Sequence, residues 1–280
     1  MTIIDFRLRP PLKGFLESHI FKDPARRNRF TRRLGFEPAP SAENRSLDLL
    51  FEEMDAVGVT TGLCVGRYTS AFGVIPNADV AAIAKEYPGR FFPAASIEGA
   101  NRRAAMREIE ACLALGLRMF NLEPGASAEP MHVDDRRLYP LYAFFEDHKL
   151  PVMLMTGGMP GPDISFTDPA RIDRVLADFP DLTVICSHGN WPWVDQIIAV
   201  AFRRPNLYVQ PDMYLYNLPG MEQYLRAANG FLAERFLFGT AYPLCPVKEY
   251  TEWFLKLPIR AEAMENILFR NAERLIAMCK

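Results

Sequence analysis

The sequence holds few of the residues that bind metals or form redox centres. It has four histidines and five cysteines in 280 residues, and no two cysteines form a CxxC pair. Scattered single cysteines, odd in number, favour neither a disulfide framework nor a zinc knuckle. Most of them lie in apolar runs, where a free thiol usually packs as a small core side chain. The five are Cys64, Cys112, Cys186, Cys245 and Cys279.

Long apolar runs and a strong net charge are also missing. No window reaches the roughly 20 consecutive apolar residues of a membrane-spanning helix. The net charge of -2 gives no long-range attraction to nucleic acid or to anionic membranes. The chain starts directly on an apolar strand, without the basic and apolar regions of a signal peptide. We therefore expect a cytoplasmic protein that binds neither nucleic acid nor membranes.

Short, continuously apolar segments alternate with longer segments in which apolar residues recur at helical spacing. Continuous apolar character is typical of strands buried on both faces of a parallel sheet. The expected strands cover residues 2–11, 59–65, 91–97, 117–122, 151–155, 182–186, 207–210 and 236–238. The expected helices cover residues 46–56, 78–87, 102–115, 139–148, 169–179, 193–202, 221–229, 248–256 and 261–278.

Eight strand–helix units in a chain of this length fit a closed (β/α)₈ TIM barrel. We predict one domain over residues 1–280, with an irregular insertion after the first strand at residues 10–45 and two helices at the C-terminus. An open doubly wound sheet is the alternative. Such sheets commonly carry a Gly-rich dinucleotide motif after a strand, and no strand here is followed by one.

Two arginines at the end of the first strand form the first candidate site. Arg7 and Arg9 are two residues apart, so on a strand their side chains point to the same side. Paired guanidinium groups bind carboxylates and phosphates. The alternative interpretation is two solvated arginines before Pro10-Pro11.

The insertion carries five more arginines around Phe30. A long segment directly after a barrel strand is often functional. A solvated basic helix is the favoured interpretation for most of these arginines, although one could lean over a pocket. The aromatic residues between Phe15 and Phe36 could also pack against a second copy, as a homodimer. The arginines are Arg26, Arg27, Arg29, Arg32 and Arg33.

At this point the sequence resembles the amidohydrolase superfamily, in its "amidohydrolase 2" branch. This branch is related to aminocarboxymuconate semialdehyde decarboxylase and to pyrone dicarboxylate lactonase. The resemblance covers nearly the whole chain and rests on five motifs in the right order. They are Ile3-Ile4-Asp5, Met54-Asp55-Ala56-Val57-Gly58-Val59, Ser187-His188-Gly189-Asn190 with Pro192, Phe238-Gly239-Thr240-Ala241-Tyr242-Pro243, and Asn271-Ala272.

The resemblance also locates the positions of the metal ligands in metal-using members. Those members have a His-x-His pair on strand one, one histidine each on strands five and six, and an aspartate after strand eight. Here the matching residues are Arg7 and Arg9, Met155, His188 and Ala241. Arginine keeps its proton and cannot bind a cation, and a stable transition-metal site needs about three or four side-chain ligands. We therefore predict neither a metal nor another cofactor. The remaining histidines, His19, His132 and His148, are expected to be structural.

The carboxyl ends of the strands define the expected pocket, as in other TIM barrels. Its basic residues indicate a small carboxylate as ligand. We assign substrate binding to Arg7, Arg9, Arg67, Asn121, Thr156, Tyr214 and Tyr242, and catalysis to His188, Asp212 and Glu123.

Among the catalytic candidates, His188 is the expected general acid or base because its ordinary pKa lies near neutrality. Two nearby arginines would lower that pKa and favour the neutral form. Asp212 or Glu123 could orient the imidazole or share the proton transfers. The alternatives are a salt bridge to arginine for Glu123 and a helix or turn cap for Asp212.

The preferred hypothesis is a metal-independent hydrolase or lyase that acts on a small carboxylated substrate, such as a lactone or an unsaturated acid. The metal-free lactonase relatives usually keep the strand-eight aspartate as base, and Ala241 lacks it, which leaves room for decarboxylation, isomerisation or hydration. Two alternatives stay open. One is a catalytically inactive barrel that binds an acidic metabolite or a partner, and the other is a metal-dependent hydrolase with shifted ligands.

Overall fold

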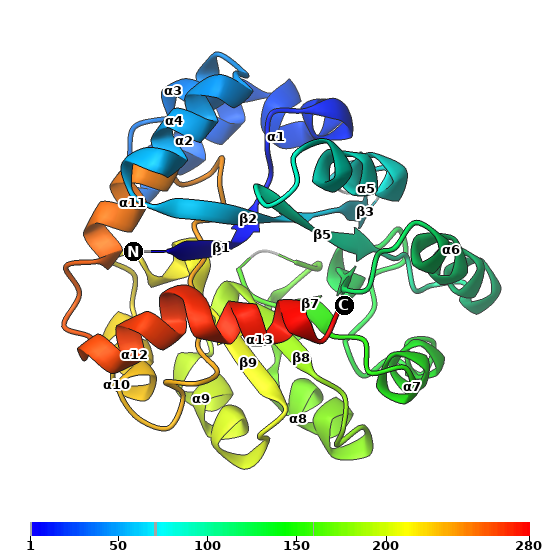
Figure 1. Ribbon diagram of the computed structural model, residues 1–280. Helices are drawn as coiled ribbons and strands as arrows, with labels where there is room; N and C mark the ends of the chain where they lie inside the picture. The colour runs from blue at the N-terminus through cyan, green and yellow to red at the C-terminus, as the bar shows by residue number, and fades with distance from the viewer. Residues whose placement is uncertain (1, 70–71, 159) are drawn as a thin grey trace.

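The parallel sheet follows the order of the strands along the chain. The computed structural model describes residues 2–69, 72–158 and 160–280, and in it seven strands pair in the order β1-β2-β5-β6-β7-β8-β9. Helices form an outer ring around these strands (Figure 1). The strands are β1 (Ile3–Leu8), β2 (Val59–Val65), β5 (Phe91–Ser96), β6 (Phe120–Leu122), β7 (Val152–Met155), β8 (Val184–Ser187) and β9 (Leu207–Gln210).

Residues 236–242 close this sheet into a barrel. Phe236 forms a parallel bridge with Val209 of β9, and Tyr242 forms one with Leu8 of β1. Backbone hydrogen bonds connect the segment to both neighbouring strands. The segment therefore takes the place of the eighth strand, and the predicted (β/α)₈ TIM barrel is confirmed.

The outer helices begin and end within two residues of the predicted ranges. Their first turns explain why. The Ser46 side chain accepts a hydrogen bond from the backbone of α4, and Asp168 caps α8, which has proline at its first position. The helices are α4 (Leu47–Ala56), α5 (Asn77–Glu86), α6 (Arg102–Ala114), α7 (Tyr139–Asp147), α8 (Pro169–Asp178), α9 (Val194–Arg203), α10 (Met221–Ala228), α11 (Val247–Phe254), α12 (Ala261–Glu265), a π-helical turn at Asn266–Arg270 and α13 (Asn271–Ala277).

Two apolar layers hold the barrel together. The larger layer lies between the sheet and the ring of helices, and the smaller fills the barrel interior with alternate strand residues such as Phe6, Leu63 and Ile185. Ala272 and Leu275 of α13 belong to the interior layer. Helix α13 lies across one end of the barrel (Figure 1), so it covers the amino ends of the strands. The carboxyl ends are left for a site.

The insertion is helical rather than irregular, which corrects the prediction for residues 10–45. Asp23 accepts a hydrogen bond from the Arg26 amide at the start of α2, and Gly35, with φ of 97°, ends the helix. The phenylalanines of the insertion suggested a homodimer. Three of them, Phe15, Phe21 and Phe36, are buried within the chain's own core. The insertion contains a 3₁₀ turn at Lys13–Glu17, α1 (His19–Lys22), α2 (Pro24–Leu34) and α3 (Pro40–Glu43).

A small hairpin, β3 (Arg67–Thr69) paired antiparallel with β4 (Gly73–Ile75), was not predicted. Its strands are too short to give a periodic signal. Four 3₁₀ turns also follow barrel strands, at Pro124–Ala126, Ile164–Thr167, His188–Asn190 and Asp212–Leu215. Within the described ranges no helix combines the length and the apolar character of a membrane span.

Candidate active site

A cavity of about 290 Å³ opens at the carboxyl ends of the strands. Strand ends form its floor, and helices of the insertion form part of its wall. Its described lining contains seven arginines and a single acidic residue, Glu123. The arginines are Arg7, Arg9, Arg26, Arg27, Arg29, Arg33 and Arg67. Such an excess of positive charge in one cavity of an overall slightly acidic chain favours anionic ligands.

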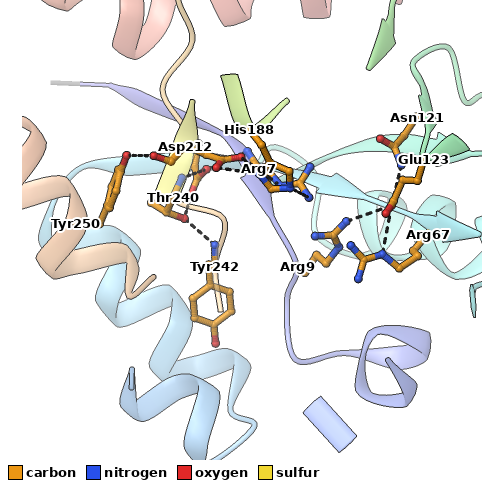
Figure 2. Close-up of polar contacts among 11 residues, drawn as sticks. Arg7, Arg9, Arg67, Asn121, Glu123, His188, Asp212, Thr240, Tyr242 and Tyr250 are labelled. Atoms are coloured by element: carbon orange, nitrogen blue, oxygen red, sulfur yellow. Dashed lines mark hydrogen bonds and ion pairs between the residues drawn. The ribbon is translucent and has the colours of Figure 1, made fainter. Parts of the chain in front are cut away.

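Arg7, His188 and Asp212 form one cluster on the floor, drawn at the centre of Figure 2. His188 Nδ1 lies 3.0 and 2.9 Å from the two carboxylate oxygens of Asp212. Its Nε2 lies 3.3 Å from Arg7 Nη2, and Arg7 Nε lies 3.5 Å from Asp212 Oδ2. Because Asp212 can only accept and Arg7 can only donate, these partners assign the proton to Nδ1 and leave a lone pair on Nε2.

The electrostatics of this cluster keep the imidazole neutral. Burial lowers the pKa of His188, and Arg7 and Arg9 lower it further, while Asp212 opposes them. The predicted direction is therefore right, although burial and not the arginines is the larger cause. A neutral imidazole can accept a proton at Nε2 from a ligand that displaces the hydrogen bond from Arg7.

The backbone at these positions adopts an unusual conformation. His188, Asp212 and Ala241 have φ of 62°, 43° and 59°, in the left-handed region that few residues other than glycine occupy. Each residue follows or lies at the end of a barrel strand. Left-handed turns at strand ends often hold functional side chains, at a cost of about 1 kcal/mol or more each.

Arg9, Arg67 and Glu123 form a second cluster, on the right of Figure 2. Glu123 Oε1 lies 3.2 Å from Arg67 Nε and 3.8 Å from Arg9 Nη2, and it accepts a hydrogen bond from Asn121 Nδ2 at 3.2 Å. Burial raises the pKa of Glu123, but Arg67, Arg9 and Arg7 outweigh it and lower the pKa to about 2. Glu123 is thus a permanently ionised partner of two arginines, which is the salt-bridge alternative, and it does not contact His188.

The two floor arginines are short of acceptors. Burial and the neighbouring cations Arg67 and Arg7 lower the pKa of Arg9 well below its usual value. Nε and Nη1 of Arg7, and Nε and Nη2 of Arg9, are buried without a hydrogen-bond partner among the described residues. Buried donors are normally satisfied, and leaving them unpaired costs about 1–3 kcal/mol each. Arg7 Nε and Arg9 Nη2 face the carboxylates of Asp212 and Glu123 at 3.5 and 3.8 Å. An anion between the two side chains would supply acceptors for Arg7 Nη1 and Arg9 Nε.

The insertion contributes more of the cavity than we expected. Four of its five arginines line the cavity. Arg26, Arg29 and Arg33 are exposed to solvent as well, so the solvated helix describes them, whereas Arg27 is buried. Arg32 is also exposed and pairs with Glu37. His19 also lines the cavity while its Nδ1 lies 3.1 Å from the Phe72 carbonyl oxygen. The spacing of Arg26, Arg29 and Arg33 on one face of α2 was the available signal.

Three predicted binding residues point elsewhere. Thr156 Oγ1 lies 3.3 Å from Cys186 Sγ, because the preceding residue, Met155, faces the cavity and successive strand side chains alternate. Asn121 is fully buried behind Glu123. Tyr242 points away from the floor (Figure 2), with its hydroxyl 2.9 Å from Ser41 Oγ. These three are not among the described residues that line the cavity.

Tyr214 does line the cavity, as predicted. Its ring packs edge-on against the His188 ring, with 5.2 Å between the ring centroids, and stacks on the Trp191 ring, with 5.3 Å between the centroids. Two further residues support the floor from behind, Tyr250, which the sequence did not single out, and Asp5, which the sequence named only as part of the Ile3-Ile4-Asp5 motif. The Tyr250 hydroxyl donates to the Asp212 carbonyl, and Asp5 accepts from the backbone amides of Arg7 and Thr240. Both side chains are buried, and no local pattern around them reports these contacts.

The donor set does not fit a divalent cation. The positions that resemblance matches to metal ligands do gather at the cavity, but they carry Arg7, Arg9, Met155, His188 and Ala241. Across residues 2–69, 72–158 and 160–280, no three His, Cys, Asp or Glu side chains come together as a metal site would require. Both ring nitrogens of His188, the imidazole on the floor, already form hydrogen bonds, Nδ1 with Asp212 and Nε2 with Arg7.

Solved structures with the same fold include one of high sequence identity. An uncharacterized TIM-barrel protein from Bordetella bronchiseptica is 66% identical, with a TM-score of 0.99 over 100% of this chain and 99% of that one. A 2,6-dihydroxybenzoate decarboxylase from Rhizobium is 16% identical, with a TM-score of 0.73 over 100% of both chains. A 4-oxalomesaconate hydratase from Rhodopseudomonas palustris is 16% identical, with a TM-score of 0.68 over 99% of this chain and 96% of that one.

The two low-identity likenesses show a shared fold only. A comparison with curated proteins found no match. The model of the amidohydrolase family, in contrast, matches residues 4–277, which is nearly the whole chain. The strand ends, the loops of the cavity and the closing segment all lie inside this match. The chain therefore belongs to the amidohydrolase family.

Proposed function

We propose that the protein is a metal-independent hydrolase or lyase that acts on a small carboxylated substrate, such as a lactone or an unsaturated acid. The observation that carries this proposal is the pair of buried, under-partnered guanidinium groups of Arg7 and Arg9 next to the Nε2 lone pair of His188. Fixed positive charge can bind a carboxylate and stabilise an enolate or oxyanion as charge develops. A metal ion would otherwise supply that stabilisation.

In this proposal each residue of the floor has a separate task. Arg7 and Arg9 hold the anionic group of the substrate. His188 exchanges a proton with the substrate through Nε2, and Asp212 fixes the tautomer by accepting from Nδ1. Since Arg7 Nη2 lies 3.3 Å from Nε2, an oxyanion on Arg7 is held next to the proton-transferring atom. Such positioning is worth a large part of enzymatic rate acceleration.

The test is a panel of lactones and unsaturated carboxylic acids, assayed with metal ions chelated. We expect turnover of at least one compound, and loss of that turnover in Arg9→Met and His188→Asn. Arg32→Gln is the matched control, because Arg32 pairs with Glu37 away from the cavity. Full rates in both floor variants would refute the assignment of these residues.

Two other measurements separate the alternatives. A catalytically inactive barrel would gain thermal stability with a carboxylate from the panel while forming no product, since a ligand that binds only the folded state stabilises it. A metalloenzyme with shifted ligands would carry a tightly bound metal after purification. Zinc or manganese at one ion per chain, found by elemental analysis, would overturn metal independence.

The proposed location is the cytoplasm. All five cysteines are free, and four of them are buried. Free thiols are typical of a reducing compartment. Fractionation of cells that produce the protein would test this.

A further inference from the structure

Helix α2 presents a row of arginines to the mouth of the cavity. Arg26, Arg29 and Arg33 are spaced at i, i+3 and i+7, so they lie on one face of the helix, and all three line the cavity. All three are exposed to solvent. None of them forms an ion pair with a described residue, whereas Arg32, which does not line the cavity, has its Nε 3.0 Å from Glu37 Oε2.

This row has no side-chain ion-pair partner among the described residues that line the cavity. The only acidic residue in the described lining is Glu123, and Arg67 and Arg9 already share its Oε1. Helix α2 itself contains five arginines and no acidic residue. Like charges one turn apart on a helix repel each other, so the row destabilises the helix that carries it. An anion at the mouth would relieve this repulsion.

The row is held in place by the rest of the insertion. Arg27 Nη1 donates to the Ala42 carbonyl at 3.1 Å, which fixes α2 to α3. Ser41 of α3 is anchored in turn, with its hydroxyl 2.6 Å from Glu53 Oε2 and 2.9 Å from the Tyr242 hydroxyl. Arg27 also lines the cavity and keeps Nη2 buried without a partner among the described residues. The mouth is therefore a positioned cationic surface with unused donors.

The cavity lining also holds apolar side chains, from the insertion and from the strand ends. Phe30, Leu244, Met155 and Met213 belong to its lining. A ligand that satisfied both ends would carry an anionic group at each end of a short apolar body. Two separated charged anchors with apolar contacts between them give both affinity and orientation.

We propose that the substrate is a dicarboxylate, with one carboxylate held by Arg7 and Arg9 on the floor and the second held by Arg26, Arg29 and Arg33 of α2. This inference rests on the proposed function, because it extends the ligand of the same site. It assigns to the exposed face of α2 the selection of dicarboxylates over monocarboxylates.

The test measures binding, so that it does not depend on finding the reaction. Titration calorimetry compares succinate, glutarate, adipate and pimelate with the monocarboxylates of the same chain length. We expect at least one dicarboxylate to bind about tenfold more tightly than its monocarboxylate, since each exposed ion pair adds only a few-fold to affinity. The advantage should shrink as salt is raised, because solvent-exposed charges are screened.

Variants then locate the second anchor. Arg29→Gln with Arg33→Gln should bring the ratio of dicarboxylate to monocarboxylate affinity down to about one, and Arg32→Gln on the same helix should keep the wild-type ratio. Arg9→Met should weaken both classes of ligand. Glutamine is a good helix former, so α2 should persist, and the melting temperature checks this.

Several results would overturn the proposal. They are equal affinities for the two classes of acid, no binding of any dicarboxylate, or an advantage that survives in the α2 double variant. Phosphonate analogues form a further arm. If 3-phosphonopropionate shows the α2-dependent advantage and no dicarboxylate does, the second group is a phosphate and the dicarboxylate assignment is wrong. Turnover of a monocarboxylate without any dicarboxylate advantage would refute this inference alone and leave the proposed function intact.

Discussion

Replacing Glu123 by glutamine should lower the free energy of unfolding of the ligand-free protein and raise its affinity for anions. Glu123 is 5% exposed, and its Oε1 receives Arg67, Arg9 and Asn121. Glutamine keeps the shape and one carbonyl acceptor but removes the charge. Arg9 and Arg67 would then remain buried without any anionic partner in the described lining.

The size of the loss follows from the pKa of Glu123. The arginines lower it from 4.5 to about 2 against the opposing effect of burial. At about 1.4 kcal/mol for each pH unit, this lowering corresponds to roughly 3 kcal/mol of stabilisation of the charged form. Breaking a buried ion pair by removing one partner typically costs about 3–5 kcal/mol. We expect the free energy of unfolding at pH 7 to fall by about 3 kcal/mol.

Urea denaturation of the wild type and of Glu123→Gln measures this difference at several pH values. Because the folded pKa is lower than the unfolded one, the stabilisation is complete above pH about 4.5 and is lost as the pH falls toward 2. The two proteins should therefore converge at low pH. Added glutarate should stabilise the variant more than the wild type, since its cavity has one negative charge fewer.

Glu37→Gln is the matched control. Glu37 Oε2 lies 3.0 Å from Arg32 Nε, close to the 3.2 Å between Glu123 Oε1 and Arg67 Nε, but the Arg32 and Glu37 side chains are 55% and 80% exposed. An exposed ion pair of this kind contributes little to the free energy of unfolding. If Glu123→Gln were as harmless as Glu37→Gln, or if its effect did not change between pH 7 and pH 3, the electrostatic account of the floor would be refuted.

Three further substitutions test other parts of the site. Asp212→Asn should lower kcat by about 100-fold or more, because an amide can donate to His188 Nδ1 and place the proton on Nε2, and steady-state kinetics on a panel substrate would measure it. Asp5→Asn should remove a pH dependence of stability. Burial raises the pKa of Asp5 to about 7, so between pH 4 and 7 the wild type should lose up to about 4 kcal/mol relative to the variant in urea titrations. Gly158→Ala should cost about 2–4 kcal/mol by urea denaturation, because its Cβ would overlap the Tyr214 hydroxyl and its φ is 83°.

Each of these has a defined contrary outcome. An unchanged kcat in Asp212→Asn would mean that His188 does not need this partner. A constant stability difference between wild type and Asp5→Asn from pH 4 to 7 would mean that Asp5 is ionised throughout. For Gly158→Ala the control is Gly116→Ala, where φ is 84° and nothing lies within 4 Å of a Cβ. Equal costs for the two glycine variants would leave no role for the tyrosine contact.

The barrel was predictable because its signals are local and repeated. A buried parallel strand needs a short apolar run and an amphipathic helix needs apolar residues at helical spacing, and both patterns recur eight times along the chain. The pairing of Arg7 and Arg9 was equally predictable, because residues i and i+2 of a strand point to the same face of the sheet. The orientation of the insertion could not be predicted from the sequence, because the charges of an arginine-rich helix are satisfied equally well by water or by an anion.

Individual pocket residues were harder to predict than the pocket itself. Whether Met155 or Thr156 faces the cavity depends on a one-residue register, and the structure shows Met155 there. Tyr242 lies in a motif next to the site, but its hydroxyl forms a hydrogen bond with Ser41 and so points away from the cavity. The pairing of Glu123 with Arg67 joins residues that are 56 positions apart, which no local pattern reports.

Because the charges of the floor are paired with one another, converting the floor into a metal-binding site would require several residues to change at once. Arg9→His alone would take away one of the cations that balance Glu123, and Ala241→Asp alone would add a carboxylate to a floor that already holds Asp212. Either single replacement upsets the existing balance before three ligands for a metal ion have come together. Within this family, the guanidinium and metal-ion solutions would then be separated by intermediates that serve neither, which is a barrier to evolving, or engineering, one from the other in single steps.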